Sequence, residues 1–371
     1  MKPANEMELA EAIRAANGPL RIVGGGTRAI GRMPAGEVLE TAGFSGISLY
    51  EPGALTIVAG AGTPLADIEA ELAKGGQRLS FEVPDMRGLL GRSGASTIGG
   101  VVACNASGPR RIQAGACRDS LIGVRFVDGA GAVIKNGGRV MKNVTGYDLV
   151  KLMAGAQGTL GVLTEVSFKV LPRPEVEATL IRDGLDPAAA VVAMSKALGS
   201  PFEVTGAGYI GGQVRLRIEG MAGSVAYRQT ALAKLLGPGW GLAEAGQSAD
   251  LWAEIRDVAP FVGKPGAVWR ISVKPSDMPG LLALLGDTQT FCDWGGGLIW
   301  ALVPEEGDAM AGVLRAYLNA LGGHATLVRA SEAMLAEVPV FHPEPAAVAA
   351  LTAGLRAKFD PRGVLNHGLM E

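Results

Sequence analysis

The sequence predicts an α+β protein of two domains, and three observations support this prediction. The chain has 371 residues, more than the ~100–200 residues of a usual single domain. A glycine-rich stretch, residues 96–174, encloses two apolar strands, Leu121–Val127 and Val162–Val170. Beyond Pro174 these glycine motifs stop, all five tryptophans occur, and strand-like and helix-like segments alternate. The expected parts are a first domain over residues 1–174, a second over 175–344 and a tail over 345–371.

The first domain begins with short elements separated by glycine and proline. Apolar residues at helical spacing predict a helix over Met7–Asn17 and another over Thr63–Gly75, where Thr63 is a suitable N-cap. Short apolar runs between them predict strands. These strands are Leu20–Val23, Val38–Glu40, Gly46–Tyr50 and Leu55–Ala59.

The second domain alternates strands with helices after a composition change. Gln213–Glu219 alternates apolar and polar residues strictly, which is typical of a strand with one solvated face. Such a series predicts an antiparallel sheet with helices on one face. The other expected strands are Ala178–Ile181, Ala267–Val273 and Gly297–Leu302, and the expected helices are Asp186–Leu198, Ser224–Leu236, Asp308–Leu321 and, in the tail, Pro345–Phe359.

Composition and charge narrow the function classes. The chain has 34 Lys and Arg against 36 Asp and Glu, with no long basic run, which argues against nucleic acid as a partner. No apolar run reaches the ~18 residues of a membrane span, and the N-terminus lacks a signal-peptide core. We therefore expect a cytoplasmic protein, at most peripheral to the inner membrane through a complex. Cys104, Cys117 and Cys292 form no CxxC pair, so no iron–sulfur cluster or zinc site is expected.

A glycine loop, Gly24-Gly25-Gly26-Thr27, follows the first expected strand. Glycine costs conformational entropy, so dense glycine indicates backbone that approaches a flat ligand closely and leaves N–H groups free for an anion. A Rossmann dinucleotide site is the alternative, because Gly24, Gly26 and Ala29 fit a loose Gly-x-Gly-x-x-Ala pattern. A Rossmann site needs a helix next, whereas residues 28–42 are broken by glycine and proline. The sequence therefore disfavours NAD binding.

Four segments stand in the order found in one group of flavoproteins. They are GGGT at 24–27, SGASTIGG at 93–100, NASGPRR at 105–111 and GTLGVLT at 158–164. With them the chain resembles the vanillyl-alcohol-oxidase/PCMH flavoprotein superfamily. The phrases GxCRDxxxGVR, VMKNVTGYDL, LMAGAQGTLGVLTE and GGHATL are most similar to the E subunits of bacterial glycolate oxidase (glycolate dehydrogenase). The resemblance implies a PCMH-type FAD-binding domain of two α+β subdomains, an α+β cap domain, and a tail that returns to the FAD domain.

The resemblance also implies which residues bind FAD. The loop Ile22–Arg28 would hold the pyrophosphate on backbone amides, and residues 93–100 would follow the pyrophosphate and ribityl chain. Residues 105–107 would pass near the isoalloxazine ring, and residues 161–162 would face the adenine. The implied cofactor-binding set is Ile22, Val23, Gly24, Gly25, Gly26, Thr27, Arg28, Ser93, Thr97, Ile98, Gly99, Gly100, Asn105, Ala106, Ser107, Arg110, Gly161, Val162 and Asn366.

Several residues have two interpretations. Arg110 and Arg111 either add positive charge near the FAD phosphates or flavin N1, or form a surface for a partner. Arg270, in VWRISV, either faces the flavin and binds a carboxylate or is an ordinary solvent-facing strand residue. Tyr147, in the phrase that begins at Lys142, is expected to be buried with its hydroxyl satisfied. A partner interface and core packing explain four cap residues equally well, namely Trp240, Leu242, Leu251 and Trp252.

No catalytic residue is identified from the sequence. No histidine precedes His324, so a histidyl link to FAD in the first domain is excluded. A cysteinyl link through Cys104 or Cys117 is the alternative to non-covalent FAD, which we expect. Related enzymes that oxidise D-2-hydroxy acids carry an HxxGDGN metal motif, which this chain lacks, so no metal is expected. The resemblance therefore implies an accessory or electron-transferring FAD subunit of a glycolate dehydrogenase complex. That complex would oxidise glycolate to glyoxylate with a paralogous catalytic flavoprotein subunit and an iron–sulfur subunit.

Two alternatives stay open. One is a self-sufficient FAD-dependent oxidoreductase of a small hydroxy acid, with its base among Tyr209, Tyr317 and His324. The other is a scaffold subunit that has lost FAD. The retained glycine segments argue against a scaffold, because holding a complex together does not require them.

Overall fold

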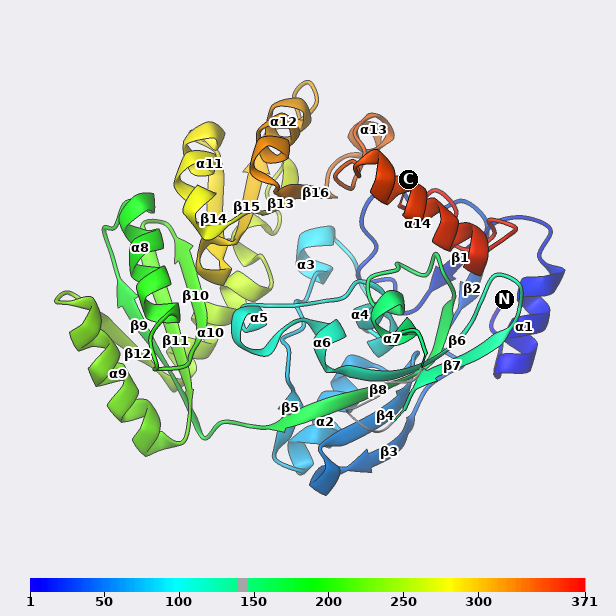
Figure 1. The fold of residues 1–371 in the computed structure, drawn as a ribbon, viewed down its shortest axis with the longest axis horizontal. Helices are drawn as coiled ribbons and strands as arrows, with labels where there is room; N and C mark the ends of the chain where they lie inside the picture. The colour runs from blue at the N-terminus through cyan, green and yellow to red at the C-terminus, as the bar shows by residue number, and fades with distance from the viewer. Residues whose placement is uncertain (139–145, 371) are drawn as a thin grey trace.

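Two α+β halves meet in the computed structural model, which describes residues 1–138 and 146–370. The chain passes from the first half to the second between β8 (Val162–Pro172) and β9 (Val176–Arg182), beside the predicted boundary at residue 174. Figure 1 shows this crossing and shows the C-terminal helix α14 (Ala346–Phe359) back on the first half. The predicted fold class, α+β with antiparallel sheets, is confirmed.

The first subdomain is built around two parallel strands. β1 (Leu20–Val23) pairs with β2 (Glu37–Glu40), and the tail joins them through a bridge between Leu20 and Leu365. Helix α1 (Glu6–Ala15) covers the pair and buries Leu9 and Ile13. Its N-terminal N–H groups need partners, and the Asn5 side chain caps it by accepting from the Glu8 N–H at 3.0 Å.

The second subdomain is an antiparallel sheet in the order β3-β4-β8-β6-β7, with β5 paired to the end of β8. Helix α2 (Leu65–Lys74) packs on it through Ile68 and Leu72. Thr63, predicted as the cap of this helix, precedes the N-cap residue Pro64, and its hydroxyl donates to the Gly60 carbonyl at 2.7 Å. The remaining strands are β3 (Ile47–Glu51), β4 (Thr56–Gly60), β5 (Gln77–Leu79), β6 (Leu121–Val127) and β7 (Val133–Gly137). The short helices are α3 (Arg87–Leu90), α4 (Ile98–Ala103), α5 (Arg111–Ala114), α6 (Cys117–Ser120) and α7 (Leu149–Met153).

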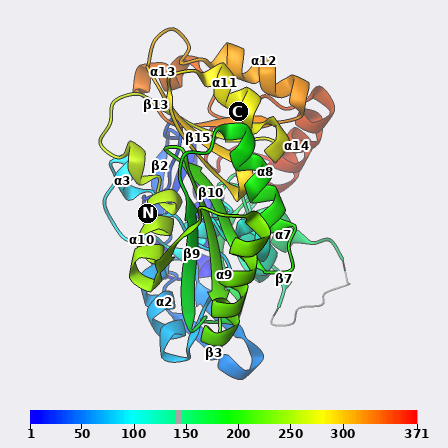
Figure 2. The same ribbon diagram turned by 90° about the vertical axis from the view of Figure 1, so that its left-hand side faces the viewer.

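The cap domain is an antiparallel sheet in the order β12-β9-β11-β10-β14-β15-β13-β16. Its outer face is covered by α8, α9, α11 and α12, and Figure 2 shows α8 and α9 over the strands. The other strands are β10 (Val204–Ile210), β11 (Gln213–Gly220), β12 (Gly241–Glu244), β13 (Ala267–Ser272), β14 (Gln289–Asp293), β15 (Leu298–Val303) and β16 (His324–Arg329). The helices are α8 (Pro187–Leu198), α9 (Ala222–Leu236), α10 (Ala245–Arg256), α11 (Met278–Leu285), α12 (Ala311–Leu321) and α13 (Glu332–Glu337).

The inner face of the cap sheet departs from the sequence prediction in two ways. Helix α10 lies on this face, where Trp252 and Ile255 pack with Phe291, so the helices are not all on one side. β11 has no solvated face, since Arg217 is 1% exposed and Glu219 is 7% exposed. The alternation in β11 was correct, but its charged face is covered by α10 and by the first domain. A strand pattern reports which residues share a face and not what covers it.

Among the described residues, no helix is long and apolar enough to cross a membrane.

Candidate functional site

The glycine loop lies directly against residues 93–97 of the first domain. A Cβ atom on Gly25 would stand 1.6 Å from the Ala95 carbonyl oxygen, and one on Gly24 would stand 2.4 Å from the Thr97 hydroxyl oxygen. Real side chains cannot occupy such positions, so glycine is needed here for the close approach of two loops. This contact joins two of the segments that the sequence assigned to FAD.

These two loops carry backbone donors without protein partners. The N–H groups of residues 24–28 and 93–97 make no hydrogen bond to another described residue. Convergent free N–H groups form a site for an anion, and the diphosphate of FAD has that chemistry. The loops therefore fit the group that the sequence predicted for them.

Asn366 holds this loop in place through its side-chain amide. Its Oδ1 accepts from the Ile22 N–H at 2.8 Å, and its Nδ2 donates to the Gln157 carbonyl at 2.8 Å. Asn366 was predicted as a cofactor-binding residue, and the structure gives it a positioning role between β1 and the loop before β8. The next residue, His367, lines a small cavity of 160 Å³ together with Thr159.

The remaining predicted residues lie on both sides of this loop. Thr97 caps α4 by accepting from the Gly100 N–H at 3.4 Å, which places Ile98, Gly99 and Gly100 in the first turn. Gly161 precedes β8 and Val162 begins it next to β6, where Val162 is fully buried. Direct contact of these residues with FAD stays a prediction.

A cavity of 360 Å³ lies between the two domains, within the ~300–1,000 Å³ of usual small-molecule sites. The first domain lines it with four predicted residues, Arg28, Asn105, Ala106 and Ser107. The cap lines it with residues that the sequence did not bring together, Arg270, Asp293, Trp294, Trp300 and His324. Arg270 therefore faces the cavity, which favours the first of its two interpretations.

Trp294 is the link between the two walls. It follows β14 in a turn where Trp294, Gly295 and Gly296 all have positive φ, of 55°, 68° and 99°. Such a backbone is costly for a bulky residue and marks a position that the surrounding structure enforces. The Trp294 indole N–H donates to the Gly108 carbonyl at 3.1 Å, so the turn carries the indole across to the first domain.

Burial perturbs the ionisable groups of this cavity. Burial, together with the charge of Arg111, lowers the pKa of Arg270 to about 10. Burial raises the pKa of Asp293 to about 7, although its Oδ1 accepts from the Trp294 N–H at 2.7 Å. Burial and Arg270 lower the pKa of His324. Asp293 was missed from the sequence; its position at the end of a strand before the WGGG turn was the available signal.

Of the three tyrosine or histidine residues considered as a base, only His324 lines the cavity. The Tyr209 hydroxyl donates to the Leu185 carbonyl at 2.8 Å. Tyr147 is 89% exposed, so the expectation of a buried tyrosine is wrong. Lys142 lies outside the described residues. Among the described residues, no three His, Cys, Asp or Glu side chains are grouped to hold a metal ion.

Arg110 is placed differently from the prediction. It was expected near FAD, but its guanidinium donates to both carboxylate oxygens of Glu219, at 3.0 and 2.7 Å, and its backbone N–H donates to Glu82 at 2.6 Å. Arg111, one residue on, lines the cavity instead. Adjacent residues on a turn point in different directions, and the sequence alone did not show which arginine meets the buried acids.

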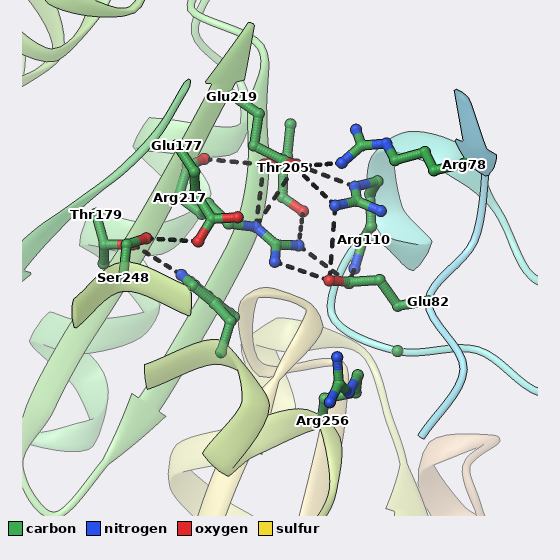
Figure 3. A network of polar contacts seen from close by, with 12 residues as sticks. Arg78, Glu82, Arg110, Glu177, Thr179, Thr205, Arg217, Glu219, Ser248 and Arg256 are labelled. Atoms are coloured by element: carbon green, nitrogen blue, oxygen red, sulfur yellow. Dashed lines mark hydrogen bonds and ion pairs between the residues drawn. The ribbon is translucent and has the colours of Figure 1, made fainter. Parts of the chain in front are cut away.

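Arg110 belongs to a buried ion-pair cluster that joins the two domains (Figure 3). Arg217 in β11 donates to both oxygens of Glu82, at 2.8 and 3.0 Å, and Arg78 in β5 donates to Glu219 at 2.7 Å. Burial alone would raise the pKa of Glu82, but Arg217 and Arg110 outweigh it and hold the pKa at about 2. The pKa of Glu219 lies well below its usual range for the same reason. We name this set, Arg78, Glu82, Arg110, Arg217 and Glu219, the interdomain ion cluster.

The fold and the two glycine loops define a flavoprotein with a PCMH-type FAD-binding domain. The model of the family "FAD binding domain" matches residues 1–137. Over 357 residues the chain is 39% identical to the glycolate oxidase subunit GlcE of Escherichia coli K12, covering 95% of this chain and 92% of that relative. The chain belongs to the GlcE family of FAD-dependent oxidoreductases, and its cofactor is FAD.

Two further similarities are narrower. The chain is 42% identical over 99 residues to the glycolate oxidase subunit GlcD of Bacillus subtilis 168, covering 26% of this chain and 21% of that relative. A solved structure of alkyldihydroxyacetonephosphate synthase aligns with 99% of this chain and 76% of its own, at a TM-score of 0.70 and 17% identity. That last likeness concerns the fold alone. The GlcE and GlcD relatives are named as subunits, which supports a protein that works with partners.

Proposed function

We propose that this chain is the FAD-binding subunit of a glycolate dehydrogenase complex that oxidises glycolate to glyoxylate. Its partners would be a paralogous FAD-containing catalytic subunit and an iron–sulfur subunit, in the cytoplasm and peripheral to the inner membrane. Similarity to GlcE along 95% of the chain supports the subunit class. The single structural observation that carries the FAD site is the pair of loops, 24–28 and 93–97, with unpartnered N–H groups.

The residues of this chain would hold FAD without a covalent link. Backbone N–H groups of the two loops would bind the diphosphate. Asn366 connects the start of the first loop to Gln157, because its side-chain amide is hydrogen-bonded to the Ile22 N–H and to the Gln157 carbonyl. Asn105, Ala106 and Ser107 form the wall of the cavity next to which the flavin ring would lie. When bound, FAD supplies the acceptance of two electrons that the oxidation of a hydroxy acid requires.

The scaffold alternative is disfavoured by the same observation. A protein that only holds a complex together gains nothing from two loops of unpartnered donors. One observation supports the self-sufficient enzyme: Asp293 places a buried carboxyl group, a candidate general base, in the cavity. We retain it as the second candidate.

The first test is the absorption spectrum of the purified chain before and after acid precipitation. We expect yellow protein that releases its FAD to the supernatant. Gly25→Ala should lose FAD, since its Cβ would meet the Ala95 carbonyl oxygen, whereas Gly18→Ala should keep it, since nothing lies within 4 Å of a Cβ there. A colourless wild-type chain that cannot be reconstituted would favour the scaffold.

A dye-reduction assay with glycolate and D-lactate then separates the accessory subunit from the complete enzyme. Released FAD without turnover supports the accessory role. Brisk turnover by the chain alone would overturn that role and establish the self-sufficient oxidoreductase.

A further inference from the structure

Two of the guanidinium groups that line the interdomain cavity, those of Arg111 and Arg270, have no carboxylate partner among the described residues. Arg111 comes from α5 of the FAD domain, and Arg270 comes from β13 of the cap. Both lie over the indole ring of Trp294, at 4.8 Å and 5.1 Å from its centre. Arg111 donates to the Ser107 hydroxyl at 2.9 Å, and the Arg270 side chain makes no hydrogen bond to another described residue. Two cations from different domains therefore contact the same aromatic ring.

This arrangement is electrostatically incomplete. Buried charges are normally paired, because an unpaired charge loses its hydration without compensation. Here burial and mutual repulsion act together, and they lower the pKa of Arg270 to about 10. An anion between the two guanidinium groups would remove the repulsion and supply the missing acceptors. Arginine is suited to this because its planar fork binds both oxygens of a carboxylate.

Polar groups suited to a hydroxyl lie next to the arginine pair. On β13, Arg270 and Ser272 alternate toward the cavity, and β16 places Thr326 opposite Arg270 and His324 opposite Ser272. These four residues form one polar patch on the inner face of the cap sheet. A small molecule with its carboxylate on the arginines would have its neighbouring carbon within the reach of three hydrogen-bonding side chains.

We propose that Arg111 and Arg270 bind the carboxylate of a small 2-hydroxy acid, or of its 2-oxo product, in the cap-side half of the interdomain cavity. The identity of the acid rests on the proposed function, whereas the anion site rests on the arginine pair alone. The site is built from both domains, so the bound acid also holds the cap against the FAD domain. The chain then contains a substrate or product site of its own.

Asp293 makes the affinity of this site depend on pH. The charged groups that act on it are Glu82, Arg217 and Arg270, and burial raises its pKa to about 7. Below that pH the carboxyl is neutral and the arginine pair dominates the cavity. Above it the carboxylate adds a negative charge to the cavity, which opposes the charge of a bound anion. Anion affinity is therefore expected to fall as the pH rises from 6 to 8.

The test is a calorimetric titration of the FAD-loaded chain with glycolate, glyoxylate and the uncharged glycolamide, at pH 6 and pH 8. We expect both acids to bind and glycolamide not to bind. Arg270→Met and Arg111→Met should each weaken binding about tenfold or more, which corresponds to ~1.4 kcal/mol. Arg270→Lys should retain part of the affinity. Arg173→Met is the matched control, since it removes one exposed positive charge outside the cavity lining.

Asp293→Asn supplies a second measurement. It preserves the acceptor for the Trp294 N–H and removes the titration, so the difference in affinity between pH 6 and pH 8 should shrink. The Trp294 indole lies against both cations, so quenching of tryptophan fluorescence that disappears in Trp294→Phe would report the same event.

Several outcomes overturn the proposal. They are no binding of either acid at millimolar concentration, full binding by Arg270→Met, an equal loss in Arg173→Met, or equal binding of chloride and glycolate. Failure of the proposed function looks different. A chain that holds no FAD, or that never joins a glycolate-oxidising complex, would contradict that function while the titration of the chain still tests the arginine pair.

Discussion

Two groups of arginines lie at the boundary between the domains, and they differ in what surrounds them. In the interdomain ion cluster, Arg110 and Arg217 are each bonded to both oxygens of a buried glutamate. In the cavity, Arg28, Arg111 and Arg270 are not within ion-pair distance of any described carboxylate. Arg110 and Arg111 are neighbours in sequence and belong to different groups.

Whether an arginine has a carboxylate partner indicates whether it stabilises the fold or is available to a ligand. A buried guanidinium with carboxylate partners is satisfied within the protein and resists change, because removing one partner strands the other. A half-buried guanidinium without partners contributes little to folding and remains available to a ligand. We therefore expect the first group to control whether the domains stay together and the second to control what binds between them.

The largest expected effect is the removal of a carboxylate from the interdomain ion cluster. Glu219→Gln keeps the shape of the side chain but leaves Arg78, Arg110 and Arg217 with Glu82 as their one remaining acid in the cluster. Breaking a buried ion pair in this way costs about 3–5 kcal/mol. The measurement is the free energy of unfolding in urea, followed with and without FAD.

Glu254→Gln is the matched control for that variant. It removes the partner of Arg215, but the Glu254 side chain is 39% exposed, so water replaces the lost contact. Exposed pairs of this kind contribute about 0.2–1 kcal/mol. Equal losses in the two variants would mean that burial does not distinguish the cluster from a surface pair, and the comparison would fail.

An intermediate effect is expected from acid. The pKa of Glu82 falls from 4.5 to about 2 on folding, so its contribution to stability is fully present above pH 4.5 and is lost as the pH falls toward 2. At pH 3 we expect the wild type to lose about 2 kcal/mol from this group relative to pH 5. Stability curves at both pH values for wild type and Glu82→Gln are the measurement. The variant should show a smaller loss, and parallel curves would contradict the assignment.

The two groups of arginines also show which parts of the fold and site could be predicted from the sequence. The glycine loops and the strands around them were predictable, since the consecutive glycines that include Gly24 and Gly25 are visible in the sequence even though the residues that they contact lie far along the chain. Strand β11 was recognised, but its charged residues were expected to face water. The partners of Arg217 and Glu219, namely Glu82, Arg78 and Arg110, all lie more than a hundred positions earlier. No periodicity within a strand can indicate a contact at that distance.

The cavity was hardest to foresee for a related reason. Trp294 meets Arg111 through a turn with positive φ at three successive residues, a conformation that depends on tertiary contacts. Arg110 and Arg111 are chemically identical in the sequence, and their opposite environments arise from the direction in which a turn points each side chain. The sequence therefore shows that two arginines are adjacent, but only the tertiary structure shows which one is paired with a carboxylate and which one lines the cavity.

The smallest expected effect on stability is also the sharpest test of the comparison. Arg270→Met replaces a desolvated cation, repelled by Arg111, with an apolar side chain of similar length. The contact of Arg270 with the Trp294 ring is lost, at a cost of about 0.5–2 kcal/mol, but relief of repulsion and burial opposes that cost. We expect the free energy of unfolding in urea to differ between this variant and the wild type by less than about 1 kcal/mol. Arg217→Met, which removes both guanidinium hydrogen bonds of Glu82, should cost several times more. If the two variants were equally unstable, Arg270 would be a structural residue, and the cap would offer no free guanidinium to a ligand in the cavity.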